Sequence, residues 1–196
     1  MVKRKPSKAL TRFETRDLTP DDFPILAKLF GSNGACAGCW CMWWRLEAGE
    51  KLGDIAYAEA RRRQKALVEA GRSRGVLAFA EGEPVGWAAW ARRSELPRLG
   101  RSRTLACDDA EEVFSLPCFF VRAGFRGQGV ARALLRHALE SLEREGARIA
   151  EAYPVALGRP VSNGEAFTGI VPFFESEGFV TITRGRTGRQ RARRAL

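Results

Sequence analysis

"VRAGFRGQGVARALLRHALESL", residues 121–142, changes character twice along its length. It begins at the end of an apolar run, passes through glycines at positions 124, 127 and 129, and continues as an amphipathic pattern. Apolar residues recur in that pattern at three- and four-residue steps, which predicts a helix from Gly129 to about Glu145 with one buried face. These residues are Ala131, Leu134, Leu135, Ala138 and Leu142.

A strand that runs through glycines into a helix is suited to binding an anion. The first amides of a helix have no acceptor within it, and the helix dipole adds partial positive charge. Glycines let an anion approach these amides because no side chain stands in the way. A nucleotide P-loop is excluded because Val130 and Ala131 follow Gly129 in place of Lys and Ser or Thr. A dinucleotide fingerprint is excluded because Arg132 occupies the place of its third glycine.

The rest of the chain alternates between short strands and helices. The apolar run 113–121 is typical of a central strand covered on both faces, and Pro117 within it predicts a bulge or a break in pairing. Residues 75–96 predict a β-hairpin around the turn "EGEP", and the polar residues 97–112 predict a loop. Further strands are predicted at 11–18, 147–155 and 179–184, further helices at 19–30, 53–70 and 169–177, and a possible edge strand in the arginine-rich tail 185–196.

Composition indicates the cellular compartment and the general class of partner. The 196 residues carry 33 Lys and Arg against 23 Asp and Glu, a formal net charge of +10 that attracts anions of any kind. Residues 1–10 are basic and predicted to be disordered, and 11–196 are predicted to form one domain. No apolar run approaches the roughly 20 residues that cross a bilayer, so no membrane partner is predicted. Five cysteines, an odd number, argue against a secreted disulfide framework and favour a cytoplasmic location.

The stretch "RGQGVA", residues 126–131, resembles the R/Q-x-x-G-x-G/A signature of the GNAT superfamily, the acyl-CoA-dependent N-acetyltransferases. Val121 matches the family's strand-ending Val, and "FFESEGF", residues 173–179, resembles its closing motif. The order of elements is similar from residue 11 to about 184. The resemblance implies an α/β (α+β) fold, with a mixed, mostly antiparallel central sheet flanked by helices and splayed at the acyl-CoA site.

By this resemblance, acetyl-CoA would bind as a co-substrate along the strand end and the glycine turn. The backbone of the strand would pair with the pantetheine arm, and the amides of the turn would hold the pyrophosphate, with an arginine beside it. The residues are Phe119, Phe120 and Val121 for the arm, and Arg126, Gly127, Gln128, Gly129, Val130, Ala131 and Arg132 for the pyrophosphate. A tight turn without a ligand is the alternative. His137, the sole histidine, is predicted to be a flanking residue of the helix.

The family's usual general acid is missing. That acid is a Tyr four residues before the Gly of the closing Gly-Phe, where this chain has Phe174. Tyr153 lies on the strand that by resemblance faces the acyl group, so it is the candidate acid, with a hydrogen-bonded core tyrosine as the alternative. Glu151, on the same strand face, and Glu111, before the central strand, are candidate bases. Catalysis by positioning alone also stays open.

The stretch "CAGCWCMWW", residues 36–44, combines cysteines with tryptophans. Its C-x-x-C-x-C spacing suggests zinc, but structural zinc takes four ligands and a partner pair is absent, so no metal is expected. A redox pair at Cys36 and Cys39, or small thiols buried under tryptophans, are the other interpretations. By resemblance, residues 31–71 form the substrate side. Its wall would consist of Trp40, Trp43 and Trp44, which suits a cationic amine or an aromatic or extended acceptor, and a plain core cluster is the alternative.

Together these patterns predict an N-acetyltransferase that moves an acetyl group from acetyl-CoA to a primary amine by direct attack. A small molecule or a peptide could supply the amine. The missing Tyr leaves a non-catalytic acyl-CoA-binding or sensing domain as an alternative. The positive charge and the arginine-rich tail leave a nucleic-acid-associated protein as a third, whose binding would weaken steeply with salt.

Overall fold

The structure is a computed structural model of the 196-residue chain. It describes residues 13–158, 162, 164–183 and 187–196. The predicted disordered start at 1–10 lies outside the described residues, as do Arg184 and Arg186 of the basic tail. Within the described ranges, no helix has both the length and the apolar character to cross a membrane.

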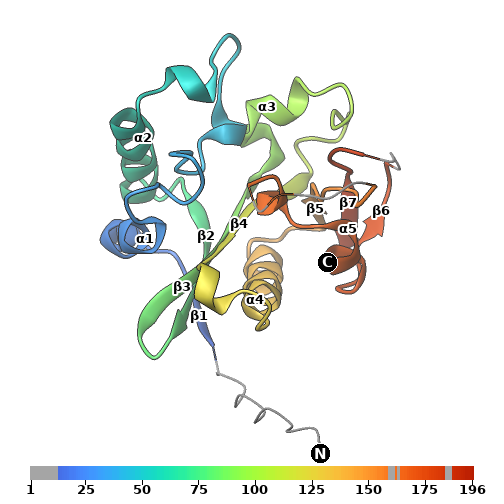
Figure 1. Ribbon diagram of the computed structural model, residues 1–196. Coiled ribbons are helices and arrows are strands. Elements are labelled where there is room, and N and C mark those ends of the chain that lie inside the picture. Colours follow the sequence, from blue (N-terminus) through green and yellow to red (C-terminus); the bar gives the residue numbers. More distant parts are fainter. Residues whose placement is uncertain (1–12, 159–161, 163, 184–186) are drawn as a thin grey trace, which may run out of the picture.

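A seven-stranded sheet runs through the described part of the molecule in the order β1-β2-β3-β4-β5-β7-β6 (Figure 1). Neighbouring strands are antiparallel except β4 and β5, which are parallel. This mixed, mostly antiparallel sheet confirms the predicted fold class. The strands are β1 (Glu14–Asp17), β2 (Arg74–Ala80), β3 (Glu83–Arg92), β4 (Val113–Val121), β5 (Ile149–Ala152), β6 (Val180–Thr181) and β7 (Ala192–Ala195).

Helices cover both faces of this sheet. On one face, α1 (Phe23–Phe30) and α2 (Tyr57–Glu69) enclose a core that includes Leu77 and Trp87 of the predicted hairpin. On the other face lies α4 (Val130–Arg144), whose core includes the neighbouring residues Val76 and Ala88. Consecutive strand residues therefore divide between the two cores, as the alternation of side chains along a strand requires.

Two short α-helices also form among the described residues, α3 (Pro97–Gly100) and α5 (Val171–Glu175). The prediction of a loop over 97–112 is wrong at its start, where α3 forms. Pro97 stands at the first helical position, where its fixed φ suits a helix and its missing N–H costs nothing. The predicted helix at 169–177 is confirmed by α5.

The packing of α4 on β3 depends on a glycine in the strand. A Cβ at Gly86 would lie 2.7 Å from Val130 Cγ1 and 2.9 Å from Leu134 Cδ1. Leu134 and Leu135 of the predicted apolar face are fully buried, and each such burial contributes about 2 kcal/mol. This contact fixes the start of α4 next to the end of β4.

Strand β4 is paired with β5 along only its first part. Their parallel register runs from Val113 opposite Ile149 to Leu116 opposite Ala152, and it stops before Pro117, which has no N–H to donate. On the β3 side, the register shifts between Ala89 and Ala91, so the predicted bulge is confirmed. Beyond Pro117, one edge of β4 has no neighbouring strand among the described residues.

The arginine-rich tail forms an interior strand, so the prediction of an edge strand there is wrong. β7 lies between β5 and β6 and is antiparallel to both. The predicted strand 179–184 is reduced to the two residues of β6, which stands at the edge instead. The physical reason is that Arg193 of β7 has a carboxylate partner on the neighbouring strand β5. Its Nε donates to Glu151 at 2.6 Å. Such partners make an interior position favourable for a strand rich in arginine.

Candidate functional site

A cavity of about 940 Å³, called the main cavity below, lies where β4 parts from β5. Its walls come from segments far apart in the sequence: the end of β4, the glycine turn, the cysteine-rich segment and the segment leading into α5. The lining residues fall within 118–121, 125–132, 35–43 and 164–173, with Leu52 and Arg189 in addition.

The glycine turn leaves open space at the start of α4. Gly127 and Gly129 have φ values of +70° and +92°, and a Cβ on either would meet no atom within 4 Å. The amides in the first turn of α4 have no acceptor within the helix. Arg126 is held beside the turn because its Nε donates to the carbonyl of Val121 at 3.0 Å. The turn therefore offers amides, a positive helix end and a guanidinium to an anion.

The unpaired part of β4 forms the adjoining wall. Cys118, Phe119, Phe120 and Val121 all line the main cavity, directly before the glycine turn. Their backbone groups on the β5 side lie beyond the end of the parallel ladder. An extended ligand could pair with such an edge in the manner of an added strand.

The sequence model of the acetyltransferase (GNAT) family matches residues 40–157, more than half of the chain. The chain belongs to the GNAT family. It is therefore an acyl-CoA N-acyltransferase, and the resemblance stated from the sequence is confirmed. No curated protein sequence matches the chain.

Solved structures of acetyltransferases share the fold. An acetyltransferase from Thermus thermophilus is 20% identical, with a TM-score of 0.54 and coverage of 95% of this chain and 99% of that one. A GCN5-related N-acetyltransferase from Kribbella flavida is 22% identical, with a TM-score of 0.55 and coverage of 94% and 98%. The PaiA N-acetyltransferase from Thermoplasma acidophilum, solved in complex with coenzyme A, is 14% identical, with a TM-score of 0.54 and coverage of 94% and 99%.

In this GNAT protein only part of the predicted tryptophan wall reaches the main cavity. Trp43 lines it. Trp40 does not, because it is 1% exposed and packs in the core against Phe23 and Phe30, with ring centroids 6.0 and 5.4 Å away. Trp44 lines neighbouring cavities and donates its Nε1 hydrogen to the carbonyl of Pro117 at 2.9 Å. Trp40 thus belongs to the alternative predicted for this segment, a core cluster.

The backbone of the cysteine-rich segment is strained. Ala35, Ala37, Trp40 and Cys41 all have positive φ, between 45° and 70°, although none is a glycine. Each such residue costs of order 1–3 kcal/mol, so the surrounding packing must hold the segment in place. Strain of this kind occurs most often beside functional sites, and here it borders the main cavity.

Four thiols also line the main cavity, those of Cys36, Cys39, Cys41 and Cys118. The Sγ atoms of Cys41 and Cys118 are 3.8 Å apart, and Trp87 Nε1 donates to Cys41 at 3.3 Å. The hydrogen bond with Cys118 lowers the pKa of Cys41, whereas burial raises the pKa of Cys39 to about 12. A high thiol pKa at Cys39 does not favour a redox pair with Cys36. Among the described residues, no group of three or more His, Cys, Asp or Glu is placed to hold a metal ion.

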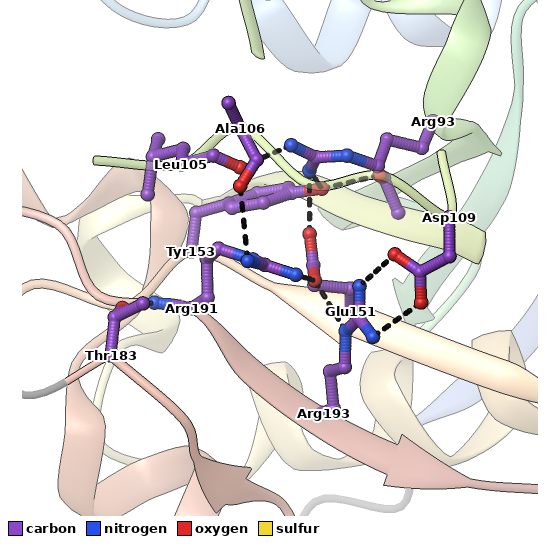
Figure 2. A network of polar contacts seen from close by, with 10 residues as sticks. Arg93, Leu105, Ala106, Asp109, Glu151, Tyr153, Thr183, Arg191 and Arg193 are labelled. Atoms are coloured by element: carbon purple, nitrogen blue, oxygen red, sulfur yellow. Dashed lines mark hydrogen bonds and ion pairs between the residues drawn. The ribbon is translucent and has the colours of Figure 1, made fainter. Parts of the chain in front are cut away.

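Tyr153 and Glu151 lie together, as strand alternation predicts, but outside the wall of the main cavity. The Tyr153 hydroxyl accepts from Arg93 at 2.7 Å (Figure 2). It also hydrogen-bonds to Ser115 at 2.6 Å. Arg93 also donates to Glu151 at 2.5 Å. Tyr153 and Glu151 are both 0% exposed, and burial raises the pKa of the Tyr153 hydroxyl. The pair therefore lies in a sealed polar site.

Two arginines of the C-terminal segment complete this site (Figure 2). Arg193 donates to both oxygens of Asp109 at 2.7 Å, and Arg191 Nε donates to Glu151 at 3.0 Å. We call Arg93, Arg191, Arg193, Glu151 and Asp109 the paired arginine network. It joins the tail to β5 and to the loop before β4, which is a structural role.

Three further residues bear on the catalytic predictions. Glu111 is exposed in the turn before β4, at the opposite end of the strand from the main cavity. Phe174, at the position of the family's usual Tyr, is 0% exposed and packs on Phe119 and Phe179. Glu165 lines the main cavity and was missed, because the segment around it has no periodic pattern.

Proposed function

We propose that this GNAT protein transfers an acetyl group from acetyl-CoA to a primary amine by direct attack of the amine on the thioester. The observation that carries the proposal is a single cavity that joins a helix start suited to anions, an unpaired strand edge and an aromatic wall. These are the three surfaces that the phosphates, the pantetheine arm and an acceptor amine require.

The pyrophosphate is assigned to the amides from Gly127 to Arg132, with the guanidinium of Arg126 beside it. The open space at Gly127 and Gly129 supports this assignment, because phosphate oxygens must come close to the amides. Arg132 contributes its amide only, since Glu177 holds its side chain at 2.5 Å. The pantetheine arm is assigned to the backbone edge of 119–121, and the acyl end to the neighbourhood of Cys118.

An attacking amine must lose a proton, and we assign the base to Glu165. Among the described residues that line the main cavity, Glu165 is the only carboxylate. The N–H and the hydroxyl of Ser162 donate to its Oε2 at 3.1 and 2.9 Å, which orients the side chain. Apolar residues such as Phe167 and Ile170 also line the cavity, and apolar surroundings favour the neutral form of an amine over the charged form. Glu165 thereby takes the role that the sequence suggested for Glu151 or Glu111, and Tyr153, buried outside the main cavity, matches the alternative of a hydrogen-bonded core tyrosine.

The pyrophosphate assignment is tested by Gly129→Asn. Asn tolerates positive φ, so this change adds a side chain with little backbone strain. We expect the Kd for coenzyme A in calorimetry to rise about 100-fold, because several charge-assisted hydrogen bonds are lost. The matched control is Gly146→Asn at the other end of α4, where φ is +75° and the space is also open. Unchanged coenzyme A binding by Gly129→Asn would contradict the assignment.

The base is tested by Glu165→Gln. We expect kcat for thiol release from acetyl-CoA to fall about 100-fold with amine acceptors, because the amide cannot take a proton. The Kd for coenzyme A should stay unchanged. Glu111→Gln, an exposed change at the far end of β4, serves as the control and should leave turnover as it is. If both variants match the wild type, catalysis proceeds by positioning alone.

A further inference from the structure

A second cavity, called the side cavity, adjoins the main one. Its volume is about 490 Å³, and Trp43 and Arg189 line both cavities. The side cavity also includes Trp44 and Arg98, from segments that are distant in the sequence. A molecule that reaches the acyl end of the main cavity past Trp43 would therefore have its other end among arginines.

Two of these arginines are stacked on aromatic rings. The guanidinium carbon of Arg98 lies 3.7 Å from the centroid of Trp43. That of Arg189 lies 4.8 Å from Phe167 and 5.5 Å from Trp44. We call Arg98 and Arg189 the stacked arginine pair. A guanidinium that presents its face to a ring keeps its in-plane N–H groups for a planar acceptor.

The stacked arginine pair forms no ion pair in the part of the chain that the structure describes, although other arginines nearby do. Arg189 donates one long hydrogen bond, 3.4 Å, to the carbonyl of Glu165, and its buried Nε has no acceptor among the described residues. Burial lowers the pKa of both arginines, and the more distant charge of the Glu165 carboxylate only partly offsets this at Arg189. The charge of Arg101 lowers the pKa of Arg98 further. Both cations are partly desolvated, and neither has an anion in direct contact among the residues that the structure describes.

A desolvated cation without an anion in contact is unfavourable, and an anionic ligand removes that cost. We propose that the acceptor amine carries a carboxylate, which the stacked arginine pair binds in the side cavity while the amine reaches the acyl group in the main cavity. This inference rests on the proposed function and adds the chemical class of the acceptor: an amino acid or another amine with a carboxylate at a distance.

The other charges of the side cavity favour a monoanion. Glu47 and Glu50 share the cavity with the stacked pair, and Glu50 is held by Arg63 at 2.9 Å. Arg101 donates to the carbonyl of Leu46. Two carboxylates would repel a doubly charged phosphate more strongly than a carboxylate. In the main cavity, where the amine end of the acceptor would lie, Trp43 and Glu165 suit an incoming ammonium group.

The probes are linear ω-amino acids of increasing chain length, starting from glycine, each compared with its primary amide. Thiol release is measured at saturating acetyl-CoA. At the preferred length, we expect the KM of the amino acid to be at least about tenfold below that of its amide, because a charge-assisted pair is formed only by the acid. The preferred length reports the spacing between the two ends of the acceptor.

The variants are Arg189→Met and Arg98→Met, which keep a side chain against the rings. In each variant, the KM of the amino acid and the KM of its amide should differ by no more than about twofold, and the KM for acetyl-CoA should be unchanged. Arg62→Met removes one positive charge from the exposed face of α2 and should preserve the ratio. Equal KM values for acids and amides in the wild type would overturn the inference, as would a preference that persists in both variants.

Failure of the proposed function can be distinguished from failure of the carboxylate site. If no amine of either series releases thiol, transfer to amines is wrong, and binding then decides the inference. The same probes are titrated into the protein with coenzyme A, and tryptophan fluorescence is recorded. Tighter binding of acids than of amides, lost in Arg189→Met, supports the carboxylate site, and equal binding overturns it.

Discussion

The paired arginine network and the stacked arginine pair are both at least partly shielded from water, yet their counter-charges differ. In the network, three guanidiniums share two carboxylates, and Glu151 at the centre is 0% exposed. In the stacked pair, aromatic rings take the place of carboxylates. The centre of the network, Arg93 with Glu151, is buried, whereas the stacked pair lines a cavity.

The difference separates charges that serve the fold from charges that serve a ligand. Buried cations with carboxylate partners gain enough to offset much of their desolvation, so they can hold two strands together. Buried cations without partners weaken the fold unless something else binds them. Removing a charge from the paired arginine network should therefore lower the free energy of unfolding, whereas removing one from the stacked arginine pair should leave it unchanged or raise it slightly.

The largest effect is expected from Glu151→Gln. Three guanidiniums would lose their shared carboxylate while they stay buried, so the free energy of unfolding should fall by about 3–5 kcal/mol. Urea denaturation measures the change. Glu111→Gln, on the exposed side of the same region, should change it by less than about 0.5 kcal/mol. A loss below about 1 kcal/mol for Glu151→Gln would mean that the network does not depend on this charge.

A smaller effect, with a pH signature, is expected from Asp109→Asn. The side chain of Asp109 is 35% exposed, so the loss at neutral pH should be about 1 kcal/mol. The Arg193 guanidinium holds the pKa of the Asp109 carboxyl well below its usual 3.8. The stabilisation is therefore present above about pH 3.8 and is lost as the pH falls towards the folded pKa, because the unfolded chain binds the proton first.

The measurement is the free energy of unfolding of both proteins from neutral pH down to about pH 2. The wild type should lose more stability over the acid part of this range than Asp109→Asn, so the two curves should converge. Parallel curves would show that Arg193 and Asp109 are not coupled in solution.

The smallest effect on stability is expected from Arg189→Met and Arg98→Met. Each variant removes a desolvated cation that forms no ion pair with the described residues, and it keeps an apolar contact with the rings. The free energy of unfolding should therefore stay within about 0.5 kcal/mol of the wild type or rise slightly. Thermal melts of the two variants beside Glu151→Gln give the comparison directly. A loss above about 2 kcal/mol in both would place the stacked pair among the structural charges.

Local patterns in the sequence predicted much of the fold. The three- and four-residue repeat of α4, the hairpin of β2 and β3 and the bulge at Pro117 each depend on residues close in the chain. The glycine turn was also found in this way, because its φ values and its missing side chains are properties of a few adjacent positions.

The candidate site was predicted only in part. Of the tryptophans, only Trp43 lines the main cavity, since hydrophobic residues of one segment can turn to either side of it. From the sequence, Arg189 was placed only in the arginine-rich tail, as part of a possible edge strand or of a surface for nucleic acid, because arginines at a chain end carry no sign of their partners. Glu165 lies in a segment without helix or strand periodicity, so nothing in the sequence marked it.

The sequence by itself determined the strand, the glycine turn and the helix that together form the proposed pyrophosphate site, and with them the family. Short-range periodicity and backbone freedom depend only on residues that are close in the chain, so they can be recognised from the sequence. Only the tertiary structure decided that β7 enters between β5 and β6, and that Arg98 and Arg189 meet beside Trp43 and Trp44. These contacts depend on which distant segments pack together. Packing also removes water from some charged side chains, and such side chains are stable only where a counter-charge lies in contact with them.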